Sequence, residues 1–465
     1  MPVKLLADDA DDMAPGARTS HEGTLRRQCA RDPAARTYAR ALPIVPVRAR
    51  GLTIEGADGR RYLDCLSGAG ALALGHNHPV VLEAIRRVLD SGAPLNVPDL
   101  ATPVKDAFVA ELFRTLPPGL ADRARLRFCG PVATDALQTA CELVSAATGR
   151  TSLITFTGAG RVKAAEPPQE HRCPFGAGDE RGADLAARWA GSLLDGTRPG
   201  VPRPAGVIVE PVQGEGEVVP VPDAWLRRMR RLTADRSVPL IVDETQTGVG
   251  RTGAFWAVEH SGVTPDVMIL SRAIGGSLPL AVVVYRDDLD VWVSGGHGDT
   301  FPGNQLAMAA GTATLVHVRE NDLAERAADL GARMLSRLQG LTEVFACVGD
   351  VRGRGLMMGL ELVRPEGWPS DDRRAPGGHT GPPTRSDSLG GPLPAAPELA
   401  ATIQSECLRR GLIVGLGGRH SNVVRLLPPL TITDEQAAAV LERLADAVGA
   451  VARRHGPWAT PPCAP

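Results

Sequence analysis

The chain has 465 residues, of which 43% are hydrophobic and 22% are charged, a balance typical of globular proteins and not of disordered or fibrous ones. Its formal net charge of −2 provides no basic field for a nucleic-acid backbone, so we expect no nucleic-acid partner. No apolar run approaches the ~18 residues of a membrane span. The first twelve residues include four aspartates instead of a basic and apolar signal sequence. We therefore expect a cytoplasmic protein that does not bind a membrane.

Two residue types restrict the chemistry. The eight cysteines are scattered, without a C-x-x-C pair or a histidine at metal-ligand spacing, so we expect free thiols and no metal site. The 51 basic residues include only three lysines, Lys4, Lys105 and Lys163. A reaction that requires an ε-amine therefore has three candidate residues.

The N-terminal part of the chain changes character near residue 41. Residues 1–40 lack hydrophobic periodicity and predict a flexible N-terminal arm. Two short apolar runs at residues 52–54 and 61–66, separated by a Gly-Ala-Asp-Gly turn, predict a hairpin. Residues 41–75 would thus form the N-terminal part of a small domain. Helices are expected after His78 and over residues 102–116.

Apolar runs then alternate with helical patterns. Runs of four to six apolar residues between helices indicate a mostly parallel sheet with helices on both faces. The predicted strands are 126–129, 153–156, 206–210, 240–243 and 267–270, and the predicted helices between them are 135–148, 184–194 and 223–236. Long helices over 304–318 and 323–338 follow. We place a large domain at residues 76–320.

The C-terminal part, residues 321–465, is predicted to be a smaller α+β domain. Apolar runs predict strands at 351–363, 412–414 and 423–427. Helical patterns predict helices at 397–410 and 434–447. Residues 364–396 are rich in Pro, Gly, Ser and Asp and predict a flexible surface insertion.

Acidic residues stand where two of the predicted strands end. Asp243 and Glu244 close one strand and are followed by Gln246, whereas Glu210 closes the preceding strand and is followed by Glu215. Because ligands of open α/β sheets bind at the carboxyl ends of the strands, we expect these carboxylates to gather at one edge. A carboxylate there needs a positive partner or a metal, and a structural cap or salt bridge is an equally good interpretation of the acidic pair.

Four motifs in one order resemble those of the class III aminotransferases, the fold type I group of pyridoxal phosphate (PLP) enzymes. The motifs are residues 210–217, 243–253, 271–276 and 300–304, and the likeness continues over 48–116, 129–150 and 412–430. Residues 72–95 and 415–430 are most similar to the L-2,4-diaminobutyrate:2-oxoglutarate aminotransferases. The resemblance implies a fold type I α/β protein, with a mostly parallel sheet in the large domain and a smaller α+β domain, that forms a homodimer.

The resemblance also implies roles for individual residues. Asp243 would pair with the ring nitrogen of PLP, and Gln246 would face the ring hydroxyl. Thr300 would reach the cofactor phosphate across the dimer interface. The loop that contains Gly130, Ala133 and Thr134, at the start of a helix, would donate backbone amides to the same phosphate. Arg425 would bind a substrate carboxylate, with Glu215 as the counter-ion that releases it. In the alternative interpretation these polar groups only support the fold.

Three departures from the family affect the chemistry. The family has its Schiff-base lysine where this chain has Arg272. A guanidinium has a pKa above ~12 and stays protonated, so it cannot attack an aldehyde or move the α-proton. Residues 159–172 contain no Phe, Tyr or Trp that could stack on the cofactor ring. Ala133 stands in the phosphate loop where the family has a glycine, and Pro302 replaces the usual arginine of the Thr-Phe-Arg-Gly-Asn pattern.

The resemblance therefore implies PLP as a cofactor. We predict that PLP is not bound covalently, and a protein that binds no PLP is an open alternative. We expect a repurposed, lysine-independent enzyme of specialised metabolism that acts on a diaminobutyrate-like carboxylate, with Asp243, Glu210 and Arg272 at its catalytic centre. One alternative is a non-catalytic pseudoenzyme that binds a metabolite or a partner enzyme. The other is a residual PLP-dependent diaminobutyrate transaminase. Lys163 is expected to be an exposed loop residue and not a substitute nucleophile.

Overall fold

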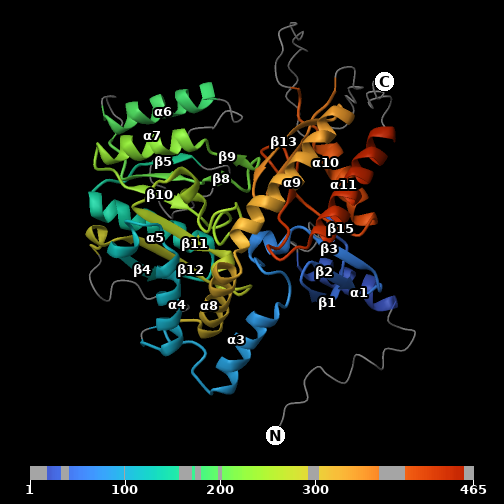
Figure 1. The fold of residues 1–465 in the computed structure, drawn as a ribbon, viewed down its shortest axis with the longest axis horizontal. Coiled ribbons are helices and arrows are strands. Elements are labelled where there is room, and N and C mark those ends of the chain that lie inside the picture. The colour runs from blue at the N-terminus through green and yellow to red at the C-terminus, as the bar shows by residue number, and fades with distance from the viewer. Residues whose placement is uncertain are drawn as a thin grey trace.

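The computed structural model describes residues 18–32, 41–98, 100–156, 170–172, 180–196, 202–291, 303–365 and 393–454. Its largest feature is a seven-stranded sheet in the order β4-β12-β11-β10-β7-β5-β6 (Figure 1). The strands are Ala124–Phe128 (β4), Leu153–Phe156 (β5), Glu170–Arg172 (β6), Gly206–Val209 (β7), Leu240–Asp243 (β10), Val267–Ser271 (β11) and Ala281–Arg286 (β12). Neighbouring strands from β11 to β6 are parallel, and β12 is antiparallel to both of its neighbours.

Helices cover both faces of this sheet because every second apolar side chain points to the same face. Ile208 and Ile269 pack with α5 in one buried cluster, whereas Val209 and Leu270 belong to the cluster that includes α6 and α7. These helices are Ala133–Thr148 (α5), Glu180–Leu194 (α6) and Asp223–Ala234 (α7). The prediction of a mostly parallel sheet between two helical layers is confirmed.

The remaining elements beside the sheet are mostly helical. They are α3 (Pro79–Asp90), α4 (Pro103–Thr115), α8 (Gln305–Glu320), α9 (Leu323–Val344) and the short helices η2 (Ser67–Gly70), η3 (Ala121–Arg123), η4 (Ala257–Ser261), η5 (Arg272–Gly275) and η6 (Asp287–Leu289), together with the hairpin β8 (Val212–Gln213) and β9 (Val219–Pro220). None of the helices in the described ranges combines the length and the apolar character that crossing a bilayer requires.

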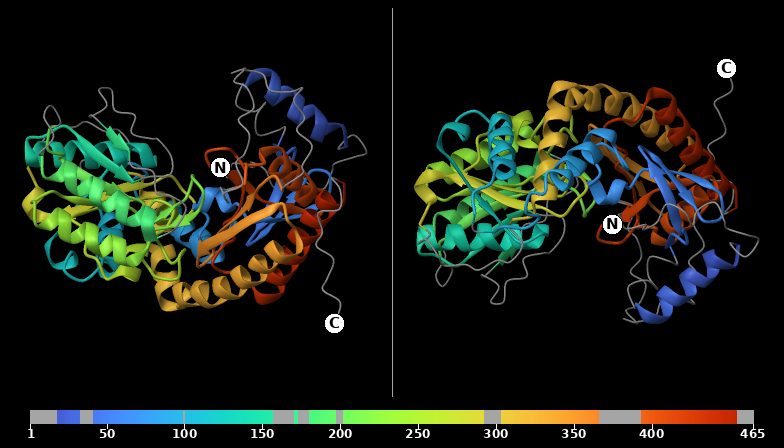
Figure 2. Two further views of the ribbon diagram at one scale, coloured as in Figure 1. Left: turned by 90° about the horizontal axis from the view of Figure 1, so that it is seen from above. Right: turned by 90° about the horizontal axis from the view of Figure 1, so that it is seen from below.

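Two four-stranded sheets lie on the other side of the molecule. In the first, β15 pairs in parallel with β3, so strands from both ends of the chain share one sheet (Figure 2). Its strands are β1 (Pro46–Arg50), β2 (Thr53–Gly56), β3 (Arg61–Asp64) and β15 (Leu412–Ile413). The second has the order β13-β14-β17-β16, with strands Val348–Arg354 (β13), Met357–Leu362 (β14), Gly415–Gly417 (β16) and Val423–Leu426 (β17). The accompanying helices are α10 (Pro397–Arg409) and α11 (Asp434–Arg454).

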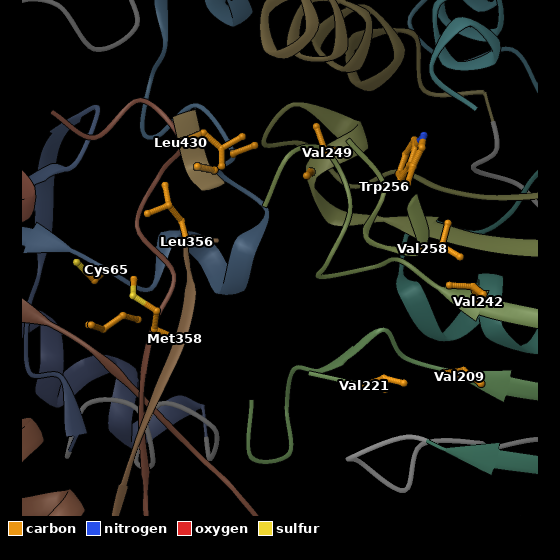
Figure 3. Packing of buried hydrophobic residues seen from close by; sticks show 14 of the residues in the cluster. Cys65, Val209, Val221, Val242, Val249, Trp256, Val258, Leu356, Met358 and Leu430 are labelled. Atoms are coloured by element: carbon orange, nitrogen blue, oxygen red, sulfur yellow. The ribbon is translucent and has the colours of Figure 1, made fainter. Parts of the chain in front are cut away.

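One hydrophobic cluster connects the seven-stranded sheet with this second part. Figure 3 shows Val209 and Val242 on strands of the large sheet and Leu356 and Met358 across from them. The guanidinium of Arg251 is buried between the two parts and donates to the carbonyl oxygens of Leu356 (3.2 Å) and Pro428. Burial lowers the pKa of Arg251 to about 10. The relative position of the two parts is thus held by apolar packing and by a buried cation.

Several elements differ from the sequence expectations. Helix α1 (Arg18–Arg31) lies within the N-terminal segment, where the polar sequence showed no periodicity. Strand β12 is a continuous apolar run, Ala-Val-Val-Val-Tyr, that the alternation of strands and helices did not include. Most of the predicted insertion 364–396 lies outside the described residues. The proposed division into a large domain at 76–320 and a small domain stays a prediction.

The turn that begins with Arg272 packs tightly against helix α8. A Cβ on Gly311 would lie 2.0 Å from the carbonyl oxygen of Ile274, and a Cβ on Gly276 would lie 2.3 Å from the carbonyl oxygen of Ala310. Gly276 also has a φ of +55°, which favours glycine. Two glycines therefore allow the end of η5 and helix α8 to pack in close contact.

Gly311→Ala should lower the free energy of unfolding by about 2 kcal/mol, because overfilling a packed contact displaces backbone. The matched control is Gly340→Ala in α9, where an added Cβ meets nothing within 4 Å. That change should raise stability by about 0.5–1 kcal/mol through helix propensity. Urea unfolding of both variants measures the difference, and equal effects would contradict the close contact.

Candidate functional site

Three neighbouring parallel strands end at one edge of the sheet, as the sequence predicted. Asp243 is the last residue of β10, Glu210 follows β7 directly, and Arg272 follows β11 directly. The carboxyl ends of parallel strands are where open α/β sheets bind their ligands. This edge of the sheet is therefore the candidate site.

Arg272 lies at this edge, directly after β11 and beside the strand that ends at Asp243. Its backbone has a φ of +56°, in the left-handed region that non-glycine residues rarely adopt. Its Nη1 donates to the carbonyl oxygen of Ala69 (2.5 Å), and its Nη2 donates to Oε1 of Glu215 (2.8 Å). The side chains of Arg272 and Glu215 are 18% and 21% exposed. The pair is a largely buried, charge-assisted contact and not a surface salt bridge.

Gln246 provides a further acceptor for Arg272. With its amide oxygen turned toward the guanidinium, it accepts from Nη1 (2.8 Å) and Nη2 (3.3 Å) of Arg272. Both terminal nitrogens of Arg272 thus have two acceptors each when Ala69 and Glu215 are included. Such a guanidinium holds neighbouring acceptors in place as a forked donor, and it provides neither a nucleophile nor a base.

Asp243 is surrounded by protein although part of its surface is accessible. Its Oδ1 accepts from the backbone amide of Thr245 (2.9 Å). Burial is the strongest influence on this carboxyl and raises its pKa above the ordinary value. The hydrogen bonds from Thr245 and the positive charge of Arg272 oppose the effect of burial and lower the pKa of Asp243, whereas the negative charge of Glu215 adds to the effect of burial. Burial thus favours the neutral form of Asp243 more than water would.

Glu244, the second member of the acidic pair, does not join this group. It is 2% exposed, and its carboxylate accepts from the backbone amide of Val258 (2.8 Å) and from the hydroxyl of Thr247. Burial raises the pKa of Glu244 to about 7. The pair therefore separates into Asp243, near Arg272, and Glu244, a structural residue that holds the following loop.

Glu210 stabilises the turn between β8 and β9. Its Oε2 accepts from the backbone amide of Gly214 (3.0 Å). A Cβ on Gly214 would lie 2.5 Å from the terminal amide group of Gln246, so glycine allows the turn to lie directly against that amide. The contact indicates that Glu210 supports the loop that carries Glu215. Its predicted catalytic role stays a prediction.

Arg425 approaches the same turn from the second part of the molecule. It lies on β17, and its Nη1 donates to the carbonyl oxygen of Gly214 (2.8 Å). A Cβ on Gly417 would lie 2.8 Å from Nε of Arg425, so this glycine of β16 leaves space for the arginine side chain. Arg425 is therefore brought to the site by a β-sheet pairing that needs a glycine beside it.

The predicted phosphate loop lies at the start of helix α5. Ala133 and Thr134 are the first residues of this helix. The carboxylate of Asp135 accepts from the amide of Val132 (3.2 Å), and a Cβ on Gly130 would lie 2.2 Å from that carboxylate. The loop thus has the backbone amides of a helix N-terminus, which attract anions. Its use for a phosphate stays a prediction.

Some predicted residues cannot be placed, and one contact was missed. Thr300, Pro302 and Lys163 lie outside the described residues. Lys105 lies on α4, where its Nζ is 5.0 Å from the centre of the Phe128 ring. The carbonyl of Ala69 was not foreseen as a partner of the site. The signal was present in Ser-Gly-Ala-Gly, since Ala69 lies between glycines and has a φ of +55°.

The sequence and structure match known proteins over nearly their whole length. The model of the family described as "Aminotransferase class-III" matches residues 34–165 and 192–448. This chain belongs to the class III aminotransferase family. It is 46% identical to a diaminobutyrate–2-oxoglutarate aminotransferase of Rhizobium meliloti, over 98% of this chain and 100% of the relative. A protein of the same name from Haemophilus influenzae is 39% identical over 92% of this chain and 95% of its own length.

Solved structures of transaminases share the fold. An omega-transaminase from Thermomicrobium roseum has a TM-score of 0.77 at 26% identity and covers 92% of this chain and 98% of its own. An amine transaminase from an uncultivated Pseudomonas species, solved in its PLP-bound internal aldimine form, has a TM-score of 0.74 at 27% identity and covers 89% of this chain and 95% of its own. The class III family predicted from the four motifs and the fold type I architecture are thus confirmed.

Glu244→Gln should flatten the dependence of stability on pH. Because the pKa of Glu244 rises from 4.5 to about 7 on folding, its stabilising contribution is complete below pH 4.5 and is lost as the pH rises to about 7. The wild type should lose about 3 kcal/mol more than the glutamine variant over this window. Urea unfolding at about pH 5 and about pH 8 tests this. Parallel pH profiles would exclude it.

Proposed function

We propose that this class III aminotransferase relative binds an amino-acid-like carboxylate and does not carry out transamination through residue 272. The observation that carries the proposal is the environment of Arg272. Its guanidinium is engaged by Ala69, Glu215 and Gln246, and it has no lone pair with which to form an imine. The residue therefore acts as a fixed cation within the site.

The residues present do not fit a covalently held PLP. The family resemblance puts the Schiff-base lysine at position 272, and the ring hydroxyl would have to face Gln246, which here accepts from Arg272. Lys105, the lysine whose side chain the structure describes, contacts Phe128. We therefore derive no catalytic step through this cofactor. The chain nevertheless has Asp243 at the end of β10 and backbone amides at the start of α5.

The carboxylate ligand is supported by the position of Arg425. A guanidinium on β17 that reaches the strand edge can bind a carboxylate through two N–H groups. The names of the relatives include diaminobutyrate and 2-oxoglutarate, an amino acid and an oxo acid with carboxylates of this kind. We therefore propose a ligand of this class, recognised chiefly at Arg425.

We further propose that the protein is an enzyme in which Asp243 moves the proton. The raised pKa of Asp243 and its position at the strand edge support this role, since burial makes a carboxyl a better proton acceptor than it is in water. A pseudoenzyme is the alternative in which the same contacts only bind a metabolite. A diaminobutyrate transaminase is the second candidate, favoured by the 46% identity over the full length of that relative.

Incubation with PLP should yield no internal aldimine. The absorbance spectrum should lack the imine band, and borohydride reduction followed by peptide mass spectrometry should find no pyridoxyl adduct at residue 272, because a guanidinium cannot form an imine. A trapped adduct on Lys163 or Lys105 together with diaminobutyrate turnover would favour the transaminase candidate instead.

Arg425→Ala should weaken the binding of 2-oxoglutarate about tenfold or more, because a charge-assisted hydrogen bond contributes about 1.5–3 kcal/mol. Isothermal titration calorimetry measures the change. Arg419→Ala is the matched control. Arg419 is exposed on the turn between β16 and β17, so its substitution removes the same charge from the same sheet. Equal losses in both variants would show a general effect of charge and not a specific contact.

We also propose that the chain forms a homodimer. Leu95 and Leu100 are large apolar side chains that are 48% and 64% exposed. The segment before α4 that carries them is hydrogen-bonded to Gln305, whose backbone amide donates to the carbonyl of Leu95 (3.0 Å). Thr300, expected to reach a partner's site, precedes Gln305 in the sequence. Exposed apolar surface of this kind supports an interface between copies.

Light scattering at micromolar concentration should report about twice the mass of one chain. Replacing both Leu95 and Leu100 by aspartate should shift the protein toward the monomer, because charges at an apolar interface are costly to desolvate. A monomeric wild type would contradict the shared interface.

A further inference from the structure

Arg272 and Arg425 contact two consecutive residues of one turn. Nη2 of Arg272 donates to Oε1 of Glu215, and Nη1 of Arg425 donates to the carbonyl oxygen of Gly214. The two arginines come from different parts of the fold, since Arg272 follows a strand of the large sheet and Arg425 lies on β17. The Gly214–Glu215 turn therefore links both guanidinium groups mechanically.

We infer that Arg272 is a positioning residue that holds the Gly214–Glu215 turn in place and thereby orients Arg425 for its carboxylate ligand. The inference rests on the proposed function, in which Arg425 is the ligand-binding group. It assigns to Arg272 an indirect effect on affinity that a lysine, with three donors on one atom, would provide only in part.

A second path connects Arg272 with the same turn. The amide oxygen of Gln246 accepts from Arg272, and Gly214 packs so closely against the other terminal atom of the same amide group that a Cβ would lie 2.5 Å from it. The backbone amide of Gly214 is held from the other side by Glu210 (3.0 Å). Glu210 thus holds the backbone amide of the turn, and Arg272 restrains the turn both through Glu215 and through Gln246. These contacts restrict the position of the Gly214 carbonyl that accepts from Arg425.

The burial of the pair makes this connection stiff. At 18% and 21% exposure, Arg272 and Glu215 have little access to water that could replace either partner. The Ala69 carbonyl holds the other side of the guanidinium, so Arg272 cannot follow Glu215 without breaking a second hydrogen bond. Movement of the turn away from Arg425 is therefore opposed by hydrogen bonds at both terminal nitrogens of Arg272.

A double-mutant cycle on the full chain tests the inference, with 2-oxoglutarate as the probe and calorimetry as the readout. Arg272→Met and Glu215→Gln should each weaken binding about tenfold, the size of a coupling between neighbouring groups. In an Arg425→Lys background, which retains a charge and measurable binding, Arg272→Met should cause little further loss. Arg272→Lys should restore only part of the affinity, because an ammonium cannot reach all the acceptors that the guanidinium holds.

The outcomes separate the inference from the proposed function. If Arg425→Lys weakens binding and Arg272→Met does not, only the positioning role is wrong. If the losses from Arg272→Met and Arg425→Lys multiply, Arg272 itself binds the ligand and the inference is overturned. If Arg425→Lys has no effect, both proposals fail. Arg272→Met leaves the negative charge of Glu215 without its arginine, so the double variant Arg272→Met/Glu215→Gln removes both charges of the pair. This double variant should also bind 2-oxoglutarate about tenfold more weakly than the wild type. Thermal unfolding of each variant checks that it is folded.

Discussion

The ion pair between Arg272 and Glu215 connects the main parts of the candidate site. A guanidinium that is 18% exposed cannot rely on water, so the protein must supply its partners. They come from the turn before β9, from the loop after β10 and from η2. Segments that are distant in sequence are thereby held at one strand edge, and the positions of Gln246, Gly214 and Arg425 follow from this requirement.

Much of the fold could be predicted because its sheet strands are buried on both faces. The runs that became β5 and β10 were predicted with their observed bounds, since an uninterrupted apolar run between two helices allows little else. Helix α1 was not foreseen because its residues have no apolar face. Strand β12 was missed although it is apolar throughout, because its antiparallel connection does not follow the strand–helix alternation used to find the others.

The site was predictable in its location and less so in its pairing. The ends of parallel strands follow from topology, so the approach of Asp243 to Arg272 could be expected from sequence. Which carboxylate would pair with which arginine could not, because that depends on side-chain directions and on turns of two or three residues. Glu215 was expected beside Arg425 and is paired with Arg272. Glu244, adjacent to Asp243, is directed to a different environment altogether.

The number of acceptors around Arg272 limits which substitutions position 272 tolerates. Because Ala69, Glu215 and Gln246 all accept from one forked donor, a lysine there would leave some of these acceptors with no donor in a poorly hydrated position. Changes in the neighbouring residues would have to accompany the lysine before it could be neutral. The effect of a mutation at position 272 is thus epistatic, since it depends on the residues that surround the guanidinium.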